Sequence, residues 1–179
     1  MCLIGYAGFL RFSELASIKA CDLNFRADCV SIFIEKSKTD KYREGTWVHI
    51  AKTGNVTCPV DMLLKYINLA GIQLNDDNFI FRQVSFCRKS QKYILRNSGK
   101  LSYTRVRELL LEKLRTLGVD SIKFGIHSLR SGGATAAANS GVPDRLFKKH
   151  GRWRSENAKD GYVKESLNVA LSVSLNLGI

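Results

Sequence analysis

The 179-residue sequence has few prolines, no paired cysteine motif and no long apolar run. Two prolines beside 45% hydrophobic residues exclude a wholly disordered chain, because this composition supplies enough apolar surface for a core. The five cysteines are never arranged as C-x-x-C, so neither a zinc site nor a disulfide framework is expected. The apolar start, residues 1–10, lacks a preceding basic region and is too short to span a membrane. We therefore expect a reduced, intracellular protein without a membrane partner.

Acidic residues are scarce relative to basic ones. The chain has 28 Lys and Arg against 16 Asp and Glu, which leaves a formal net charge of +12 at pH 7. Such an excess predicts a polyanionic partner, with nucleic acid favoured over an anionic membrane surface. Because net charge does not specify a reaction, the chemistry has to come from motifs.

Hydrophobic periodicity predicts an α+β fold, mainly helical with a small antiparallel β-sheet. Alternating apolar residues predict strands over 30–34 and 46–50, joined as a hairpin by the charged connection 36–45. Helices are expected in two short pieces over 3–18, hinged near Gly8, and then over 59–71, 106–117, 127–139, around Phe147 and over 163–177. The last of these is apolar along one face, so it is expected to dock on its own domain or on a neighbour. Without repeats or linkers, residues 1–179 are predicted to form a single domain.

One long segment, 82–107, carries eight basic side chains and no acidic one. These cations are Arg82, Arg88, Lys89, Lys92, Arg96, Lys100, Arg105 and Arg107. Aromatic residues are interleaved with them, which favours phosphate contact over the alternative of a solvated loop and helix edge. We add Arg152 and Arg154 to this set of predicted nucleic-acid contacts.

Cutting and rejoining a phosphodiester without a metal requires three kinds of side chain. Arginine suits the non-bridging oxygens, because its planar fork engages two of them at once. Tyrosine suits the nucleophile, since its phenol forms a covalent phosphoester, and a lysine near phosphate can protonate the leaving hydroxyl. The residues that fit these roles occur in the order Arg11, Lys38, His127, Arg130, Trp153 and Tyr162.

The segments that contain these residues resemble the catalytic domain of the tyrosine recombinase, or phage integrase, family. They are G-F-L-R-F-S-E-L at 8–15, S-K-T at 37–39, H-S-L-R-S-G-G-A-T at 127–135, and G-R-W-R-S at 151–155 followed by Tyr162. In that family a first arginine, a hairpin lysine, an H-x-x-R pair, a histidine or tryptophan, and a tyrosine nine positions later form the site. The same spacing separates Trp153 from Tyr162.

The resemblance implies a role for each residue. Arg11 and Arg130 would clamp the scissile phosphate, His127 would assist proton transfer and bind a phosphate oxygen, and Glu14 would orient its neighbours. Strand exchange in this family needs no metal and no other cofactor, so none is expected here.

The resemblance also implies the covalent chemistry. Tyr162 would attack to give a 3′-phosphotyrosyl link, Trp153 would pack and position the site, and Lys38 would protonate the departing 5′ hydroxyl. Lys36 and Lys41 remain alternatives for the general acid; Lys38 is preferred because S-K-T directly follows the first strand.

The favoured function is DNA breaking and rejoining, in site-specific recombination or DNA integration by a mobile element. Duplex DNA and a homo-multimer assembled on it are the expected partners, and the nucleus is the expected location if the source is a eukaryote. Two alternatives are an inactive DNA-binding remnant and a basic nucleic-acid binder that uses the helix after Pro143. Family members carry further helices and an amino-terminal domain before the first arginine, so we expect an amino-terminally truncated catalytic domain.

Overall fold

The computed structural model describes residues 1–38, 40, 42–96 and 99–178. The chain opens with two short helices, α1 (Cys2–Ala7) and α2 (Phe12–Leu15). Between them Phe9 has a left-handed backbone φ of 46°, so α1 cannot continue into α2. The predicted pair of helical pieces with a hinge near Gly8 is confirmed.

A three-stranded antiparallel sheet follows, in the order β1 (Leu23–Phe25), β2 (Cys29–Ile34) and β3 (Thr46–Ala51). Val30 lies opposite Ile50 and Ile32 opposite Val48, and all four side chains are buried. The predicted hairpin is therefore confirmed. Strand β1 is additional, because three residues are too few for an alternating pattern to stand out.

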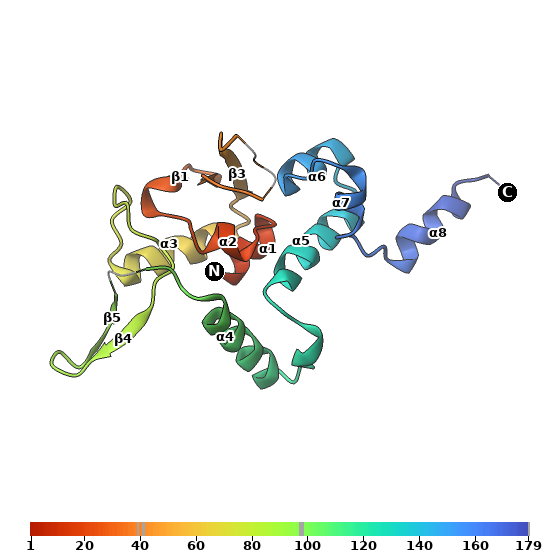
Figure 1. Cartoon of the computed structure of the whole chain (residues 1–179). Helices are drawn as coiled ribbons and strands as arrows, with labels where there is room; N and C mark the ends of the chain where they lie inside the picture. The colour runs from red at the N-terminus through yellow and green to blue at the C-terminus, as the bar shows by residue number, and fades with distance from the viewer. Residues whose placement is uncertain (39, 41, 97–98, 179) are drawn as a thin grey trace.

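Helix α3 (Pro59–Ala70) begins at a proline and ends at Gly71, whose φ of 63° is left-handed, as the sequence predicts. A second antiparallel hairpin follows, formed by β4 (Val84–Cys87) and β5 (Lys92–Leu95). This hairpin projects from the body of the molecule (Figure 1). The sequence analysis missed it, because neither strand buries a residue and so neither shows a clear pattern of apolar and polar faces.

Four helices form most of the remaining chain: α4 (Tyr103–Thr116), α5 (His127–Asn139), α6 (Asp144–Gly151) and α7 (Glu156–Asp160). Helix α5 packs against α1 and then leads to α6 and α7 (Figure 1). The contact with α1 is close, since a Cβ built on Gly133 would lie 2.1 Å from the carbonyl oxygen of Tyr6. Helix α5 therefore reaches the turn that joins α1 and α2.

Buried apolar residues form two clusters. The larger one joins α1, α2 and α3 to the sheet, with Leu15, Ile18 and Ile32 at most 1% exposed. The smaller one consists of Phe9, Ala134, Phe147 and Trp153. Because Phe9 in the α1–α2 turn belongs to the second cluster, this turn links the two parts of the core.

The last helix, α8 (Leu167–Leu175), differs from the prediction in length and in packing. It begins at residue 167 because Ser166 caps it, accepting a hydrogen bond from the backbone N–H of Val169. None of its residues is buried, and it extends away from the other helices (Figure 1). Docking on its own domain is therefore wrong for this chain. No described helix is long and apolar enough to cross a membrane.

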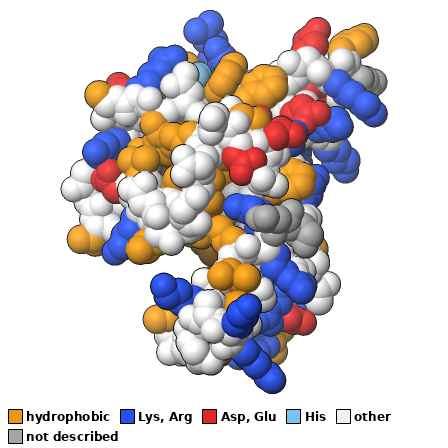
Figure 2. All heavy atoms as spheres, turned by 90° about the vertical axis from the view of Figure 1, so that its left-hand side faces the viewer, with side chains coloured by type: hydrophobic (Ala, Val, Ile, Leu, Met, Phe, Trp, Pro, Cys, Tyr) orange, Lys and Arg blue, Asp and Glu red, His pale blue; other side chains and the backbone are white. Residues whose placement is uncertain are grey.

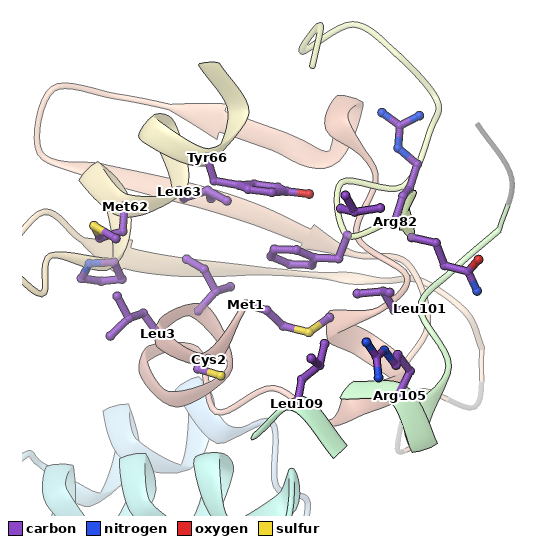
Figure 3. A pocket seen from close by; sticks show the side chains of 15 residues that line it. Met1, Cys2, Leu3, Met62, Leu63, Tyr66, Arg82, Leu101, Arg105 and Leu109 are labelled. Carbon is purple, nitrogen blue, oxygen red and sulfur yellow. The ribbon is translucent and has the colours of Figure 1, made fainter. Parts of the chain in front are cut away.

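A cavity of about 890 Å³ lies between α1, α3 and the start of α4 (Figure 3). Apolar side chains such as Met62, Leu63 and Leu109 form most of its wall, with Arg82 and Arg105 at one side. None of the predicted catalytic residues lines it. The cavity is thus distinct from the candidate site.

Candidate active site

Arg11 is positioned by Glu14, one turn further along. The backbone N–H of Arg11 donates to Oε2 of Glu14 at 2.8 Å, and its Nη1 donates to Oε1 at 2.9 Å. The Glu14 side chain is 1% exposed and that of Arg11 is 18% exposed. A carboxylate this deeply buried requires charged partners, so the pair holds the Arg11 guanidinium in a defined orientation at the surface.

Arg130 lies one turn into α5, on the same side of the helix as His127, and is fully buried. Its Nη1 donates to the carbonyl of Phe9, and its Nη2 donates to the carbonyl of Gly151 at 2.7 Å. These contacts reach the turn before Arg11 and the end of α6. One guanidinium thus joins three segments that are far apart in the sequence.

The rings of Trp153 and Tyr162 complete this cluster. Their centroids lie 5.3 Å apart, and the Tyr162 ring lies 5.2 Å from that of His127. The Arg130 guanidinium lies 5.0 Å from the Trp153 ring and 4.9 Å from the Tyr162 ring. Trp153 also packs on Phe147, which supports its predicted packing contribution. The H-x-x-R pair, the tryptophan and the tyrosine are therefore brought together.

The cluster is strongly cationic. Burial, followed by the nearby charges of Arg11 and Arg152, lowers the pKa of Arg130 to about 10. Burial is also the main cause that lowers the pKa of His127 below its usual 6.5, followed by the charges of Arg130 and Arg11. Glu14 is the one carboxylate that forms ion pairs with these guanidinium groups in the described chain. An anion would therefore be favoured at this site.

At the centre of the cluster, Nε of Arg130 and Nε1 of Trp153 are buried and have no hydrogen-bond partner within the described residues. A buried donor without a partner is costly, so an acceptor that reached either group would offset that cost. The described chain has no cluster of three His, Cys, Asp or Glu side chains that could hold a metal ion.

Lys38 lies in the loop that follows β2, and its side chain is exposed. No hydrogen bond or ion pair joins it to another described residue. Its neighbour Ser37 lines a cleft of about 280 Å³ together with Arg152 and Trp153, so the loop borders the cluster. Lys36 pairs with Glu35 at 3.4 Å. The other alternative, Lys41, and Thr39 of the S-K-T motif lie outside the described residues.

Eight of the ten cations predicted to contact nucleic acid are exposed: Arg88, Lys89, Lys92, Arg96, Lys100, Arg105, Arg107 and Arg154. Basic side chains are prominent on the lower part of the face that Figure 2 shows. Lys100 donates to Oγ of Ser17 at 2.8 Å, and Arg105 pairs with Glu108 at 3.4 Å. Their contact with nucleic acid remains a prediction.

The other two residues predicted to contact nucleic acid, Arg82 and Arg152, lie largely inside the molecule. Arg82 is 8% exposed and borders the apolar cavity between α1 and α3. The Arg152 side chain is 7% exposed and pairs with Glu14 at 2.9 Å. The sequence analysis could not detect the contact between Arg152 and Glu14, because a basic residue beside other basic residues gives no sign of a distant buried carboxylate.

His150 is a further residue at the site that the sequence analysis did not select. Its Nε2 donates to the carbonyl of Ala7 at 2.8 Å, and its ring packs edge-on against Phe9 at 4.7 Å. These contacts connect α6 to the α1–α2 turn. Burial is the main cause that lowers the pKa of His150, so the neutral ring is favoured.

Comparison with known proteins agrees with the order of these motifs. A model of the phage integrase family matches residues 1–168. A curated relative, an integrase/recombinase xerD homolog from Selenomonas ruminantium, is 30% identical over 174 residues. The match covers 97% of this chain and 48% of that protein, so the chain spans about half the length of this relative.

Solved structures share the fold. XerA recombinase matches with a TM-score of 0.71 at 16% identity, over 99% of this chain and 55% of its own. XerH site-specific recombinase bound to difH substrate, in a pre-cleavage complex, matches with a TM-score of 0.65 at 18% identity, over 97% and 44%. The Tn1549 transposon integrase in complex with transposon right end DNA gives 0.65 at 15%, over 99% and 58%.

These similarities confirm the expected mainly helical fold with small antiparallel sheets. The family model covers nearly the whole chain, and three of the four motifs that carry the resemblance meet around Arg130. The chain therefore belongs to the phage integrase family.

Proposed function

We propose that this chain is the catalytic domain of an enzyme that breaks and rejoins duplex DNA, in site-specific recombination or DNA integration. The observation that carries the proposal is the position of the buried Arg130 guanidinium, within 5.0 Å of both the Trp153 and the Tyr162 rings. Arg11 and His127 lie close to Arg130. The charge of Arg11 lowers the pKa of Arg130, and the charge of Arg130 lowers the pKa of His127. A nucleophile, an acid–base group and two cations thus lie close to one another.

The proposed step begins with attack of the Tyr162 oxygen on the scissile phosphorus. The bond from phosphorus to the 5′ oxygen breaks, and the 3′ phosphate remains attached to the tyrosine. His127, which its lowered pKa keeps neutral at pH 7, accepts the phenol proton, and Lys38 donates a proton to the leaving 5′ oxygen. A 5′ hydroxyl reverses these steps and reseals the strand.

Charge builds up on the phosphate oxygens during this transfer. Arg11 and Arg130 supply fixed positive charge, and the N–H groups of Arg130 Nε and Trp153 Nε1 would donate to a phosphate oxygen that reached them. Because these donors are held in place before substrate arrives, little reorganisation is needed in the transition state. No step requires a metal or a nucleotide cofactor.

Duplex DNA is the proposed substrate and the homo-multimer the proposed working form. The net charge of +12 and the exposed cations of the β4–β5 hairpin and α4 favour a DNA partner. XerH and the Tn1549 integrase were solved in complexes with DNA.

The exposed apolar helix α8 supports association with a neighbouring copy. Such an enzyme would act inside the cell, and in a eukaryote in the nucleus.

An inactive DNA-binding remnant is the second candidate. The convergence of nucleophile, acid–base group and cations favours the active enzyme, because DNA binding alone requires no buried arginine beside a tyrosine. The third reading, a helix-turn-helix binder that uses α6, is disfavoured. Phe147 of α6 is buried in the aromatic cluster, and His150 of α6 contacts α1.

The test is a pool of nicked duplexes with randomised arms, incubated with the full chain and separated under denaturing conditions. A nick next to the cleavage point makes the released fragment, which carries the 5′ hydroxyl, short enough to diffuse away. Resealing is then prevented, so the covalent product accumulates. We expect a band of protein covalently linked to DNA. Sequencing of the attached strand would then identify the cleavage site. Tyr162→Phe should abolish the band, and the matched control Tyr6→Phe should keep it.

Salt-sensitive DNA binding without any covalent product, in both the parent chain and Tyr6→Phe, would favour the inactive remnant. A covalent product that persists in Tyr162→Phe would show that a different residue is the nucleophile.

A further inference from the structure

We propose that Arg152 is a positioning residue that holds Arg11 in place at the scissile phosphate through the shared carboxylate of Glu14. The inference rests on the proposed function, in which Arg11 binds that phosphate. It assigns a different task to a residue that the sequence suggested would contact DNA directly.

Four hydrogen bonds of Arg152 are directed into the protein. Its Nη2 donates to Oε2 of Glu14 at 2.9 Å and to the carbonyl of Phe9 at 3.0 Å. Its Nη1 donates to the carbonyl of Gly8 at 3.2 Å and to that of His150 at 2.9 Å. With both terminal nitrogens engaged and the side chain 7% exposed, little of Arg152 can reach a DNA backbone.

These contacts act on Arg11 by two routes. Oε2 of Glu14, which accepts from Arg152, also accepts from the backbone N–H of Arg11, and the other oxygen pairs with Nη1 of Arg11. The carbonyls of Gly8 and Phe9 belong to the turn that leads directly into Arg11. Loss of Arg152 would therefore loosen both the carboxylate that orients Arg11 and the backbone that carries it.

The backbone at Arg152 strengthens the argument. Arg152 follows the last residue of α6 with a φ of 57°, in the left-handed region where glycine is the usual residue. An arginine at this position is strained unless its side chain offsets the strain, and four hydrogen bonds do so here. Arg152→Gly therefore removes the guanidinium and relieves the backbone at the same time, which makes it an informative variant.

The first measurement uses the full chain and inorganic phosphate, without DNA. Phosphate is titrated while the indole N–H signal of Trp153 is followed by NMR, after assignment with Trp47→Phe. Arg152→Gly is expected to weaken phosphate binding about tenfold, to the same extent as Arg11→Ala, because charge-assisted contacts depend on geometry. Arg152→Lys should bind phosphate with an affinity between those of the parent chain and Arg152→Gly, since an amine keeps the charge but cannot reproduce the planar fork. Arg26→Ala, which removes an exposed cation in the β1–β2 turn, is the matched control and should bind like the parent.

The second measurement compares two nicked duplexes that differ only at the scissile position, where one carries a phosphate and the other a neutral methylphosphonate. On the phosphate substrate, Arg152→Gly should slow formation of the covalent complex about 100-fold, the scale expected for a misplaced catalytic group. On the methylphosphonate substrate the loss should be several times smaller, because the negative charge that Arg11 neutralises is absent. A merely structural defect would slow both reactions alike.

Four results would overturn the inference. One is phosphate binding by Arg152→Gly that equals that of the parent chain, and another is no phosphate binding by the parent chain. The third is an equal loss of rate on the two substrates. The fourth is a decrease of about one in the salt-dependence slope of DNA binding by Arg152→Gly, which would indicate a direct contact between Arg152 and a phosphate. If the parent chain binds phosphate in an Arg152-dependent way yet forms no covalent complex, the proposed function fails while the positioning of Arg11 stands.

Discussion

The Arg130 guanidinium combines full burial with a position beside two aromatic rings and two carbonyl acceptors. Desolvating a cation is costly, and no carboxylate forms an ion pair with Arg130 within the described residues. The carbonyls of Phe9 and Gly151 offset part of this cost, and an anionic phosphate would offset more. At the scale of single residues, then, the site is organised around a buried positive charge.

Arg130→Lys tests this organisation. Lysine retains the charge but cannot donate to both carbonyls in the geometry of a guanidinium, so we expect the free energy of unfolding to fall by about 1.5–3 kcal/mol. Formation of the covalent complex should slow at least about 100-fold. Chemical denaturation and the nicked-duplex assay measure the two effects. Arg115→Lys, which affects a single hydrogen bond to Ser121, should change both only slightly.

The pH dependence should report His127. Its pKa is lowered from 6.5 by burial and by nearby Arg130 and Arg11, so the neutral ring that accepts a proton persists to mildly acidic pH. The rate of covalent complex formation should be constant above pH 7 and fall on acidification, with a midpoint below 6.5. His127→Gln should lack this acidic limb, whereas His49→Gln should keep it. A midpoint above 6.5 would contradict the assignment.

The same shift affects stability. Between the lowered pKa of folded His127 and the usual 6.5 of the unfolded chain, the unfolded state binds more protons. The free energy of unfolding is therefore highest above pH 6.5 and decreases as the pH falls through this interval. His150, whose pKa is also lowered mainly by burial, contributes in the same direction.

Among the helices and strands, the contact between α1 and α5 decides where the two arginines lie. Gly133 of α5 faces the carbonyl of Tyr6 in α1, and Arg130, one turn earlier, reaches the carbonyl of Phe9 just beyond α1. The short distance between these helices is possible because position 133 has no side chain. The spacing of the candidate catalytic groups thus depends on a glycine to which no catalytic role is assigned.

Gly133→Ala should therefore destabilise the protein. The added Cβ would lie 2.1 Å from the Tyr6 carbonyl oxygen, which cannot move without moving α1. We expect a loss of about 1–3 kcal/mol in the free energy of unfolding, together with slower covalent complex formation.

The neighbouring variant Gly132→Ala is the matched control for this loss. Its Cβ meets only the edge of the Tyr6 ring at 3.3 Å, and this ring is 41% exposed and free to adjust. Alanine also favours a helix by about 1 kcal/mol over glycine. Stability should thus stay the same or rise, and an equal loss in both variants would argue against close packing as the cause.

For the whole molecule, the distribution of apolar surface separates a packed body from the terminal helix. Leu167, Val173 and Leu175 of α8 are 73%, 70% and 79% exposed, although the helix contains no charged residue. Such a surface is unfavourable in water unless a second molecule covers it. The body does not need α8 in order to fold, because α8 buries no residue.

Deletion of residues 167–179 should separate folding from assembly. The melting temperature should change by less than about 2 °C, since surface changes away from the core alter stability by at most about 0.5 kcal/mol. Self-association on DNA, measured by sedimentation of the complex, should weaken. Replacing Leu171 and Val173 by serine should have the same effect without shortening the chain. Unchanged sedimentation in both variants would contradict a role of α8 in assembly.

Sequence alone determined the elements whose residues are buried on one face. The alternation in β2 and β3 and the proline and glycine that bound α3 were sufficient, because local periodicity and backbone preference act over a few residues. The order and spacing of Arg11, His127, Arg130, Trp153 and Tyr162 indicated the family for a related reason: the reaction requires these residue types.

Only the tertiary structure decided what depends on contacts between distant segments. Arg152 is near Trp153 in the sequence, but its partner Glu14 lies 138 positions away, so its burial has no local signal. The β4–β5 hairpin escaped detection because both its faces are exposed, and the position of α8 escaped because an apolar face does not specify which surface covers it. Periodicity records that a residue is buried, whereas the partner against which it is buried is set by the packing of the whole chain.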